Sequence, residues 1–323
     1  MANKQLIKAR LTTTLLAATV IAVSAFAQED GERISRTFNV GSEGELSLSN
    51  ISGDIRIEAT SGDEITIEAV KRMRGADDAE LLQEVEVDIS HTGNRVRVET
   101  RYPHNNRRGR DHDHSHRGGG VSVSYRVSVP VGTEVEVGSV SGDVHVRGVN
   151  GETSVQSVSG EIQVSDTSNL VRAKSVSGDV DVERARADDD LEVASVSGEV
   201  SITDVEAAEL DVSSVSGDVR MDDVACDEGE FDSVSGDIRY TGRIASGGQY
   251  EFKSHSGNVV VTIGDEVGFE LEASTFSGDV ESDFAMQVTS RGERGRNLSA
   301  VIGDGSAVIE ATTFSGDVVL RKR

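Results

Sequence analysis

The chain has few of the residues that fill or cross-link a conventional globular core. Trp is absent, aromatic residues make up 4% of 323 residues, and there are only 2 Pro and 1 Cys. A single thiol, Cys226, cannot form an internal disulfide, which excludes a small disulfide-stapled fold. We interpret Cys226 as a small residue at a corner of the fold. Because apolar residues still reach 36%, the composition favours a thin core of Val and Ile over disorder.

Positive charge is also scarce. The chain has 57 Asp and Glu against 32 Lys and Arg, for a formal net charge of −25. Binding to nucleic acid requires cations that replace phosphate counterions, so nucleic acid is excluded as a partner. An anionic membrane surface would also repel the chain. Basic proteins or divalent cations fit the charge, and the simpler interpretation is a solvated acidic surface that keeps a long β-protein soluble.

Residues 1–27 are typical of a signal peptide. Lys4, Lys8 and Arg10 precede an apolar run that is too short for a stable membrane span, and Ala25-Phe26-Ala27 is a small-x-small cleavage site. Loss of these three cations with the segment would take the net charge from −25 to −28. No second apolar run of membrane length follows. We therefore expect an exported protein, periplasmic or extracellular at the cell surface, with no membrane span after cleavage.

The strongest signal is an internal repeat built on a Ser-Gly-Asp corner. Ser-Val-Ser-Gly-Asp-Val at 139–144 returns as Ser-Val-Ser-Gly-Glu-Ile at 157–162, and late copies read Thr-Phe-Ser-Gly-Asp-Val at 275–280 and 313–318. A fixed period of this kind indicates stacked repeats. The steps between corner glycines are 18, 18, 20, 19, 19, 21, 21 and 38 residues, and we interpret the last step as two coils with one degenerate corner. The corner glycines are Gly142, Gly160, Gly178, Gly198, Gly217, Gly236, Gly257, Gly278 and Gly316.

Each copy contains two strands with alternating apolar residues. After the corner, pairs such as Val144 and Val146 share one face; before it, pairs such as Val171 and Ala173 or Leu191 and Val193 do the same. The pattern predicts an all-β protein, a β-solenoid of coils of about nineteen residues with two main strands per coil, in a single elongated domain. Length variation falls in the second corner, between the two strands.

The predicted organisation has four parts. They are a signal peptide at 1–27, an N-terminal β region with degenerate coils at 28–103, a His/Arg/Gly-rich loop at 104–120 and the repeat array at 121–323. Within the second part, 51–57 carries the repeated corner, Ser61-Gly62-Asp63 repeats it, 74–82 favours a short helical or loop excursion, and Thr92-Gly93-Asn94 predicts a hairpin turn.

Two places could bind a divalent cation. His112, His114 and His116 alternate with acidic residues, so in an extended strand their imidazoles would share one side and could hold a transition metal, although several Arg surround them. Stacking would also place the corner acids in one column, which is either an outward solvated column or a weak Ca²⁺ site. That column reads Asp143, Glu161, Asp179, Glu199, Asp218, Asp237, Asn258, Asp279 and Asp317.

Catalysis finds no distinctive residues. Ser occurs in repeat ladders without a matching His and Asp set, and carboxylate pairs are too common for one pair to stand out. Polysaccharide-active β-helix enzymes remain an alternative, but such enzymes hold sugars on aromatic platforms, and this chain has 4 Tyr and no Trp. We predict no catalytic residues, no cofactor and a non-enzymatic role.

The serial Ser-Gly-Asp-Val/Ile corner with alternating Val/Ile strands resembles the bacterial putative-adhesin repeat family, DUF4097, over roughly Thr37 to Leu320. The resemblance implies a β-solenoid fold, export or surface exposure, and no established enzymatic activity. Together with the residues above, it leads us to expect an adhesion or scaffold-type interaction module of the cell envelope or surface, with protein or envelope components as partners. Divalent-cation binding and a polysaccharide-active enzyme are the alternatives.

Overall fold

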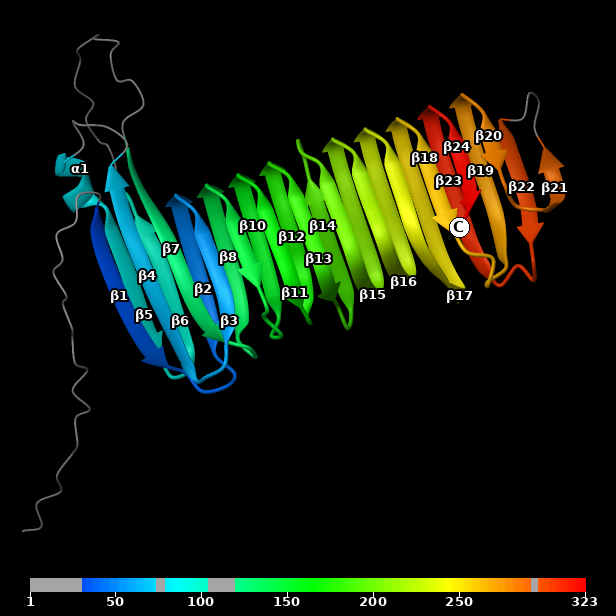
Figure 1. Cartoon of the computed structure of the whole chain (residues 1–323). Helices are drawn as coiled ribbons and strands as arrows, with labels where there is room; N and C mark the ends of the chain where they lie inside the picture. Colours follow the sequence, from blue (N-terminus) through cyan, green and yellow to red (C-terminus); the bar gives the residue numbers. More distant parts are fainter. Residues whose placement is uncertain (1–30, 74–78, 104–119, 292–295) are drawn as a thin grey trace, which may run out of the picture. The chain divides into compact units, whose positions relative to one another are not determined.

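The computed structural model describes residues 31–73, 79–103, 120–291 and 296–323. The predicted signal peptide at 1–27 and the candidate metal ligands His112, His114 and His116 lie outside these ranges. Within them the chain is all-β, and its 24 strands belong to one hydrogen-bonded sheet (Figure 1). Residues 31–323 form a single unit by their contacts. No helix of the described ranges combines the length and the hydropathy that a membrane crossing needs.

The middle of the sheet consists of consecutive copies of the repeat, which we call coils. Each coil contributes one strand before the corner glycine and one after it, and in the later copies the strand assignment runs on through the second corner. The strands are β8 (Glu134–Ser141), β9 (Val144–Arg147), β10 (Thr153–Ser159), β11 (Ile162–Thr167), β12 (Leu170–Ser177), β13 (Val180–Arg186), β14 (Asp190–Ser195), β15 (Val200–Ser216) and β16 (Val219–Ser235).

These coils pair in parallel and in register. β8, β10, β12, β14 and the second half of β15 form one row of strands, and β9, β11, β13 and the first half of β15 form the other. Equivalent residues therefore face each other across coils: Val144 pairs with Ile162, which pairs with Val180. A one-residue slip would turn every apolar side chain outward, so the alternation itself fixes this register.

The inward side chains of both rows meet in one thin core. Val144, Val146, Leu191 and Val193 are all buried, as the alternation predicts. The second corner is lined by apolar residues too, since Val149, Val205 and Val224 are buried. One inward residue was predicted wrongly. Leu170 is buried in place of its neighbour in the sequence, Val171, because the ladder between β10 and β12 shifts its register between Thr153 and Ser154.

The N-terminal part of the sheet inserts a coil out of chain order. The strand β2 pairs with β8 on one side and β6 on the other, while β3 lies between β9 and β7. Antiparallel strands then close this end, with β5 on β6 and with β4 and β1 beyond β7. The elements are β1 (Glu32–Asn39), β2 (Glu45–Ser52), β3 (Ile55–Thr60), β4 (Glu64–Met73), α1 (Ala79–Glu84), β5 (Glu86–Thr92), β6 (Arg95–Arg101) and β7 (Val121–Pro130).

Two turn predictions in this part have different outcomes. The hairpin is confirmed: β5 and β6 are antiparallel around Gly93, whose φ of 66° favours glycine. The second copy of the corner is not a stacked corner. No described atom lies within 4 Å of the place where a Cβ on Gly62 would be, because β4, which follows, turns back antiparallel to β7. The first copy does stack, with Gly53 directly beneath Gly142.

The C-terminal part also departs from chain order. The last coil, β23 and β24, lies between β17 and β18 on one side and β19 and β20 on the other, and β22 with β21 closes the end in antiparallel fashion. In Figure 1 the red C-terminal strands lie between the yellow strands and the orange ones. The strands are β17 (Ile238–Ser256), β18 (Val259–Ile263), β19 (Phe269–Ser277), β20 (Val280–Ser282), β21 (Gln287–Arg291), β22 (Asn297–Ile302), β23 (Ala307–Ser315) and β24 (Val318–Lys322).

This order overturns two expectations. Copies do not all stack in chain order, since Gly316 contacts Gly257 and Gly278 contacts Gly316. The final step of 38 residues is therefore not two coils with one degenerate corner. Part of that step forms the antiparallel pair β21 and β22, whose Leu298 and Ala300 are buried against β19 and seal the apolar end of the core.

Candidate functional site

The repeated corner holds the coils together through its backbone. A Cβ built on Gly236 would lie 2.1 Å from the carbonyl oxygen of Gly217, and the other corner glycines that follow Gly53 show approaches between 2.0 and 2.5 Å. No real side chain can occupy such a position, so glycine is required there for the close approach of neighbouring chains. This explains why the glycine is present in every stacked copy.

In most corners the hydroxyl of the first Ser or Thr donates a hydrogen bond to the corner glycine of the neighbouring coil. Ser195 is buried, and its hydroxyl donates to the carbonyl oxygen of Gly178 at 2.9 Å. Ser175, Ser214, Ser233, Ser254, Thr275 and Thr313 make the equivalent bond to the corner glycine of the neighbouring coil. Ser139 and Ser157 differ, because their hydroxyls have no partner in the described residues, and the carbonyl of Gly53 next to Ser139 accepts from Asn50 instead.

The acid after the glycine has a structural role, because its side chain joins one coil to the next. The Oδ1 atom of Asp179 accepts the backbone N–H of Glu199 at 2.8 Å, and Asp218 accepts that of Asp237 at 2.9 Å. Asp54, Asp143, Asp237, Asn258 and Asp317 make the same link to the coil above them. Asn258 shows that the link needs an oxygen acceptor and not a charge. The column therefore joins coils, and Ca²⁺ binding by its acids stays a prediction.

The residue between the two serines forms an exposed apolar row, which we call the edge ladder. Its apolar members expose between 43% and 64% of their surface, although large apolar side chains are normally buried. In stack order the row reads Ile51, Val140, Val158, Val176, Val196, Val215, Val234, His255, Phe314 and Phe276. The rings of Phe314 and Phe276 are parallel to within 3° with centroids 4.7 Å apart, and His255 stacks on Phe314 at 5.0 Å.

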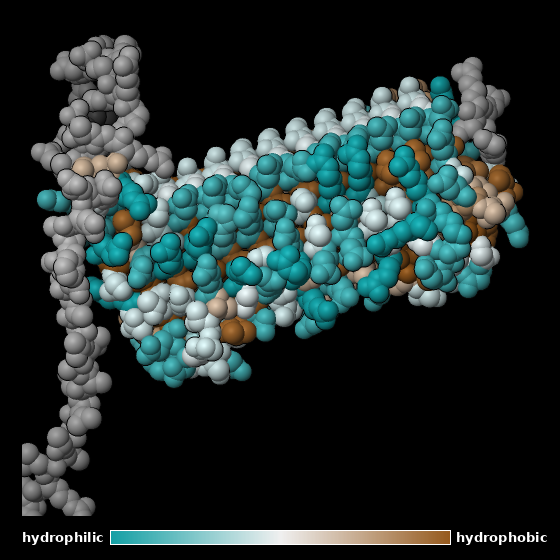
Figure 2. All heavy atoms as spheres, in the orientation of Figure 1, coloured by the Kyte–Doolittle hydropathy of each residue, from teal (hydrophilic) through white to brown (hydrophobic). Residues whose placement is uncertain are grey.

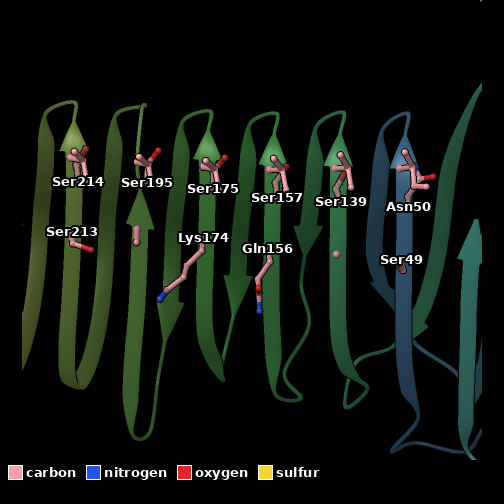
Figure 3. Close-up of a pocket in the computed structure, with 18 of the residues that line it drawn as sticks. Ser49, Asn50, Ser139, Gln156, Ser157, Lys174, Ser175, Ser195, Ser213 and Ser214 are labelled. Carbon is pink, nitrogen blue, oxygen red and sulfur yellow. The ribbon is translucent and has the colours of Figure 1, made fainter. Parts of the chain in front are cut away.

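A shallow groove of about 690 Å³ runs beside the edge ladder, from Ile51 to Val234. Figure 3 shows its floor, where Gln156 and Lys174 project from strands whose ends carry the buried serines. Small residues lie on either side of these two longer ones, with Gly138 before Gln156 and with Ala194 and Ser213 after Lys174, so the floor is low at those coils. Figure 2 shows the edge of the stack as an evenly spaced row of pale residues above a mostly hydrophilic face.

Four residues before the ladder residue, six consecutive coils from β14 to β19 place a carboxylate at the same position, which we call the acid row. In stack order it reads Glu192, Asp211, Glu230, Glu251, Glu310 and Glu272. Partial burial, and then the neighbouring carboxylates Glu192 and Glu230, raise the pKa of Asp211 above its usual value. Burial and Glu230 raise the pKa of Asp232 in the same direction.

The other sequence-predicted residues contribute less. Cys226 is buried, and burial raises the pKa of its thiol to about 12, so the thiol is protonated at neutral pH. Among the described residues no group of three His, Cys, Asp or Glu is arranged to hold a metal. The histidine trio stays a prediction, since it lies outside them. The edge ladder could have been found from the sequence. The ladder residue directly follows the first Ser of the corner, and since neighbouring residues of a strand point to opposite faces, it faces outward where that Ser faces inward.

A protein-family comparison matches residues 44–321 to the family described as Toastrack DUF4097. The chain belongs to this family. Searching the curated proteins gave no match. The matched region of this Toastrack protein runs from β2 to β24, so the strands inserted out of chain order at both ends are part of it.

Three solved structures align with most of the Toastrack chain at low identity. A putative lipid binding protein from Parabacteroides distasonis has 14% identity and a TM-score of 0.49, covering 89% of this chain and 97% of its own. A putative adhesin from the same organism has 14% identity and a TM-score of 0.43, covering 90% and 98%. A putative adhesin from Bacteroides fragilis has 12% identity and a TM-score of 0.34, covering 90% and 97%. These relatives are distant.

Proposed function

We propose that this Toastrack protein is an exported, non-catalytic interaction module of the bacterial envelope or surface, of the adhesion or scaffold type. Its coils form a β-solenoid whose outer surface presents the same residues at a fixed spacing. Basic proteins or envelope components are its partners. Export is supported by the features of residues 1–27, and the names of two of the solved relatives agree with an adhesive role.

The observation that carries the proposal is the edge ladder. Nine large apolar side chains in one row stay exposed, whereas most other large apolar residues in the described strands are buried or partly buried. Contiguous exposed apolar surface is characteristic of interaction sites. The corner beneath the ladder is fixed by glycine contacts and by Ser and Asp hydrogen bonds in successive coils. A partner would therefore meet a surface that is ordered before binding, at a small entropic cost.

A binding assay on whole cells tests the proposal. Purified, fluorescently labelled protein should bind to cells of the source organism or to extracellular matrix in a saturable way, and excess unlabelled protein should compete. A variant with Val176→Ser, Val215→Ser and Val234→Ser should bind at least about tenfold more weakly, because loss of apolar contact area weakens association. The matched control replaces three buried core valines by alanine and should keep binding if it folds. Binding that does not saturate, or that is the same in the ladder variant, contradicts the proposal.

A further inference from the structure

Over β14 to β19, three outward-facing rows run side by side across the coils. The first is the edge ladder from Val196 to Phe276, and the third is the acid row. Between them lies a floor row two residues before each ladder residue, made of Ala194, Ser213, Asp232, Lys253, Thr312 and Ser274. Outward residues along a strand are about 6.7 Å apart, so the ladder and the acid row lie about 13 Å from each other.

The acid row lacks enough cations to balance it. Glu192 is paired with Arg172 and Lys174, and Glu251 with Lys253. Asp211, Glu230, Glu310 and Glu272 form no ion pair with any residue that the structure describes. Stacked carboxylates about 4.8 Å apart repel one another, which agrees with the raised pKa of Asp211. A cationic partner would relieve this repulsion.

Over the N-terminal half of the edge ladder the two neighbouring rows have a different charge. Over β2 to β12 the positions that correspond to the acid row are Ser47, Glu136, Ser154 and Arg172, and the floor there includes Gln156 and Lys174. These positions carry one acid and two cations, whereas the two rows over β14 to β19 carry seven acids and one Lys. Apolar ladder and negative charge therefore coincide only in the C-terminal half of the stack.

The dimensions select one kind of occupant. An α-helix with its side chains is about 10–12 Å wide, which matches the distance of about 13 Å between ladder and acid row. Six coils span about 24 Å, the length of a helix of about 16 residues. A second copy of this chain would bring its own negative charge of −25 against the acid row, so self-association through this surface is disfavoured.

We propose that a basic amphipathic helix of a partner protein docks along β14 to β19, with its apolar stripe on the edge ladder and its Lys and Arg residues on the acid row. The helix lies across the strands, parallel to the direction in which the coils stack. This inference rests on the proposed interaction function and names the surface and the chemistry of the partner. Helix binding in an apolar groove uses the i, i+3, i+4 and i+7 positions of the helix.

The probe is a synthetic 16-residue peptide with Leu at those positions, Lys along one flank and Ala and Gln elsewhere. Fluorescence anisotropy measures its affinity for the purified protein, and circular dichroism measures the helix that forms on binding. A peptide of the same composition in scrambled order has the same charge without the stripe. We expect the striped peptide to bind at least about tenfold more tightly than the scrambled one and to gain helix.

Two sets of variants separate apolar contact from charge. Asp211→Asn with Glu230→Gln and Glu310→Gln should weaken binding at least about tenfold at low salt and reduce its salt dependence. Val215→Ser with Val234→Ser should weaken binding by a similar factor and leave the salt dependence unchanged. The control pair, Val140→Ser with Val158→Ser, makes the same change in the other half of the ladder and should leave the affinity within about twofold.

The inference is overturned if the scrambled peptide binds as well as the striped one, or if the control pair weakens binding as much as the Val215 and Val234 pair. The cell-binding assay shows whether the helix-docking inference or the proposed interaction function has failed. Saturable cell binding without binding of the striped peptide overturns the helix and leaves the interaction function standing. Peptide binding that depends on both sets of variants, without any cell binding, supports the docking surface and overturns the adhesive role.

Discussion

The middle of the stack and its two ends are built on different rules. From β10 to β16 each coil rests on the coil that precedes it in the sequence, and the parallel pairing repeats from coil to coil. At the ends, β2 with β3 and β23 with β24 are held between coils that are distant in the sequence, and antiparallel strands close the core. Repetition would allow further coils to be added to the middle of the stack, whereas the ends need a different topology that leaves no open strand edge for another coil.

The largest expected effect comes from comparing two deletions of similar size. Removal of 200–218 takes out one complete middle coil and lets Val180 pair with Val219, so the protein should still fold, with a modest loss of stability. Removal of 307–323 takes out the coil between β18 and β20 and should abolish cooperative folding, although it only shortens the chain at its end. Thermal unfolding followed by circular dichroism measures both. A stable, cooperative protein without 307–323 would refute the inserted position of the last coil.

The next effect compares the glycines of two copies of the Ser-Gly-Asp triplet, one stacked on a neighbouring coil and one not. In Gly236→Ala the new methyl group would collide with the carbonyl of Gly217, and we expect the free energy of unfolding to fall by about 3 kcal/mol. In Gly62→Ala no described atom is within 4 Å, and only backbone strain at a φ of 151° remains, at a cost of about 1 kcal/mol. Urea unfolding measures the two. Equal losses would mean that the close approach of chains contributes nothing.

A smaller effect separates a corner serine that bonds to the neighbouring coil, Ser195, from Ser139 beside the N-terminal insertion, which does not. Ser195→Ala removes a buried hydroxyl that donates to Gly178, and should cost about 1 kcal/mol of stability. Ser139→Ala removes a buried hydroxyl without a described partner, and should leave the stability unchanged or raise it. The same urea titration applies. A larger loss at Ser139 than at Ser195 would contradict the assignment of the hydrogen bonds.

The smallest effect concerns how stability depends on pH. Removing a carboxylate should change the stability in opposite directions in the two regions. Burial and Glu230 raise the pKa of Asp232, so the ionised carboxylate destabilises the fold, and Asp232→Asn should raise stability slightly at neutral pH, a gain that vanishes as pH falls through the raised pKa. Arg101 lowers the pKa of Glu99, so Glu99→Gln should lose stability at neutral pH, and this loss should vanish on acidification. Unfolding midpoints from pH 3 to 8 measure both. Changes of the same sign in the unfolding midpoints of the two variants at neutral pH would contradict the assigned causes of the two pKa shifts.

The sequence predicts the middle of this protein well because each inference there is local. Alternation around Val144 and Val146 sets the strand faces, and the regular glycine sets the register. The order of the end coils could not be predicted, since Gly278 and Gly316 carry the same motif and nothing in either copy says which stacks on Gly257. Val171 was misassigned because a register shift is a property of two paired strands. For the site, the acidic corner was recognised from the repeat, but the acid row was not, because it required the register across six coils.

The inserted last coil has a consequence for the timing of assembly. A chain that is synthesised from its N-terminus can lay down β10 to β16 one after another as they appear. The next coils cannot follow in this way, because the strands that pair with β18 and β20 are made after β19 to β22. The strands β19 to β22 must therefore wait beside an incomplete edge until β23 and β24 have been made.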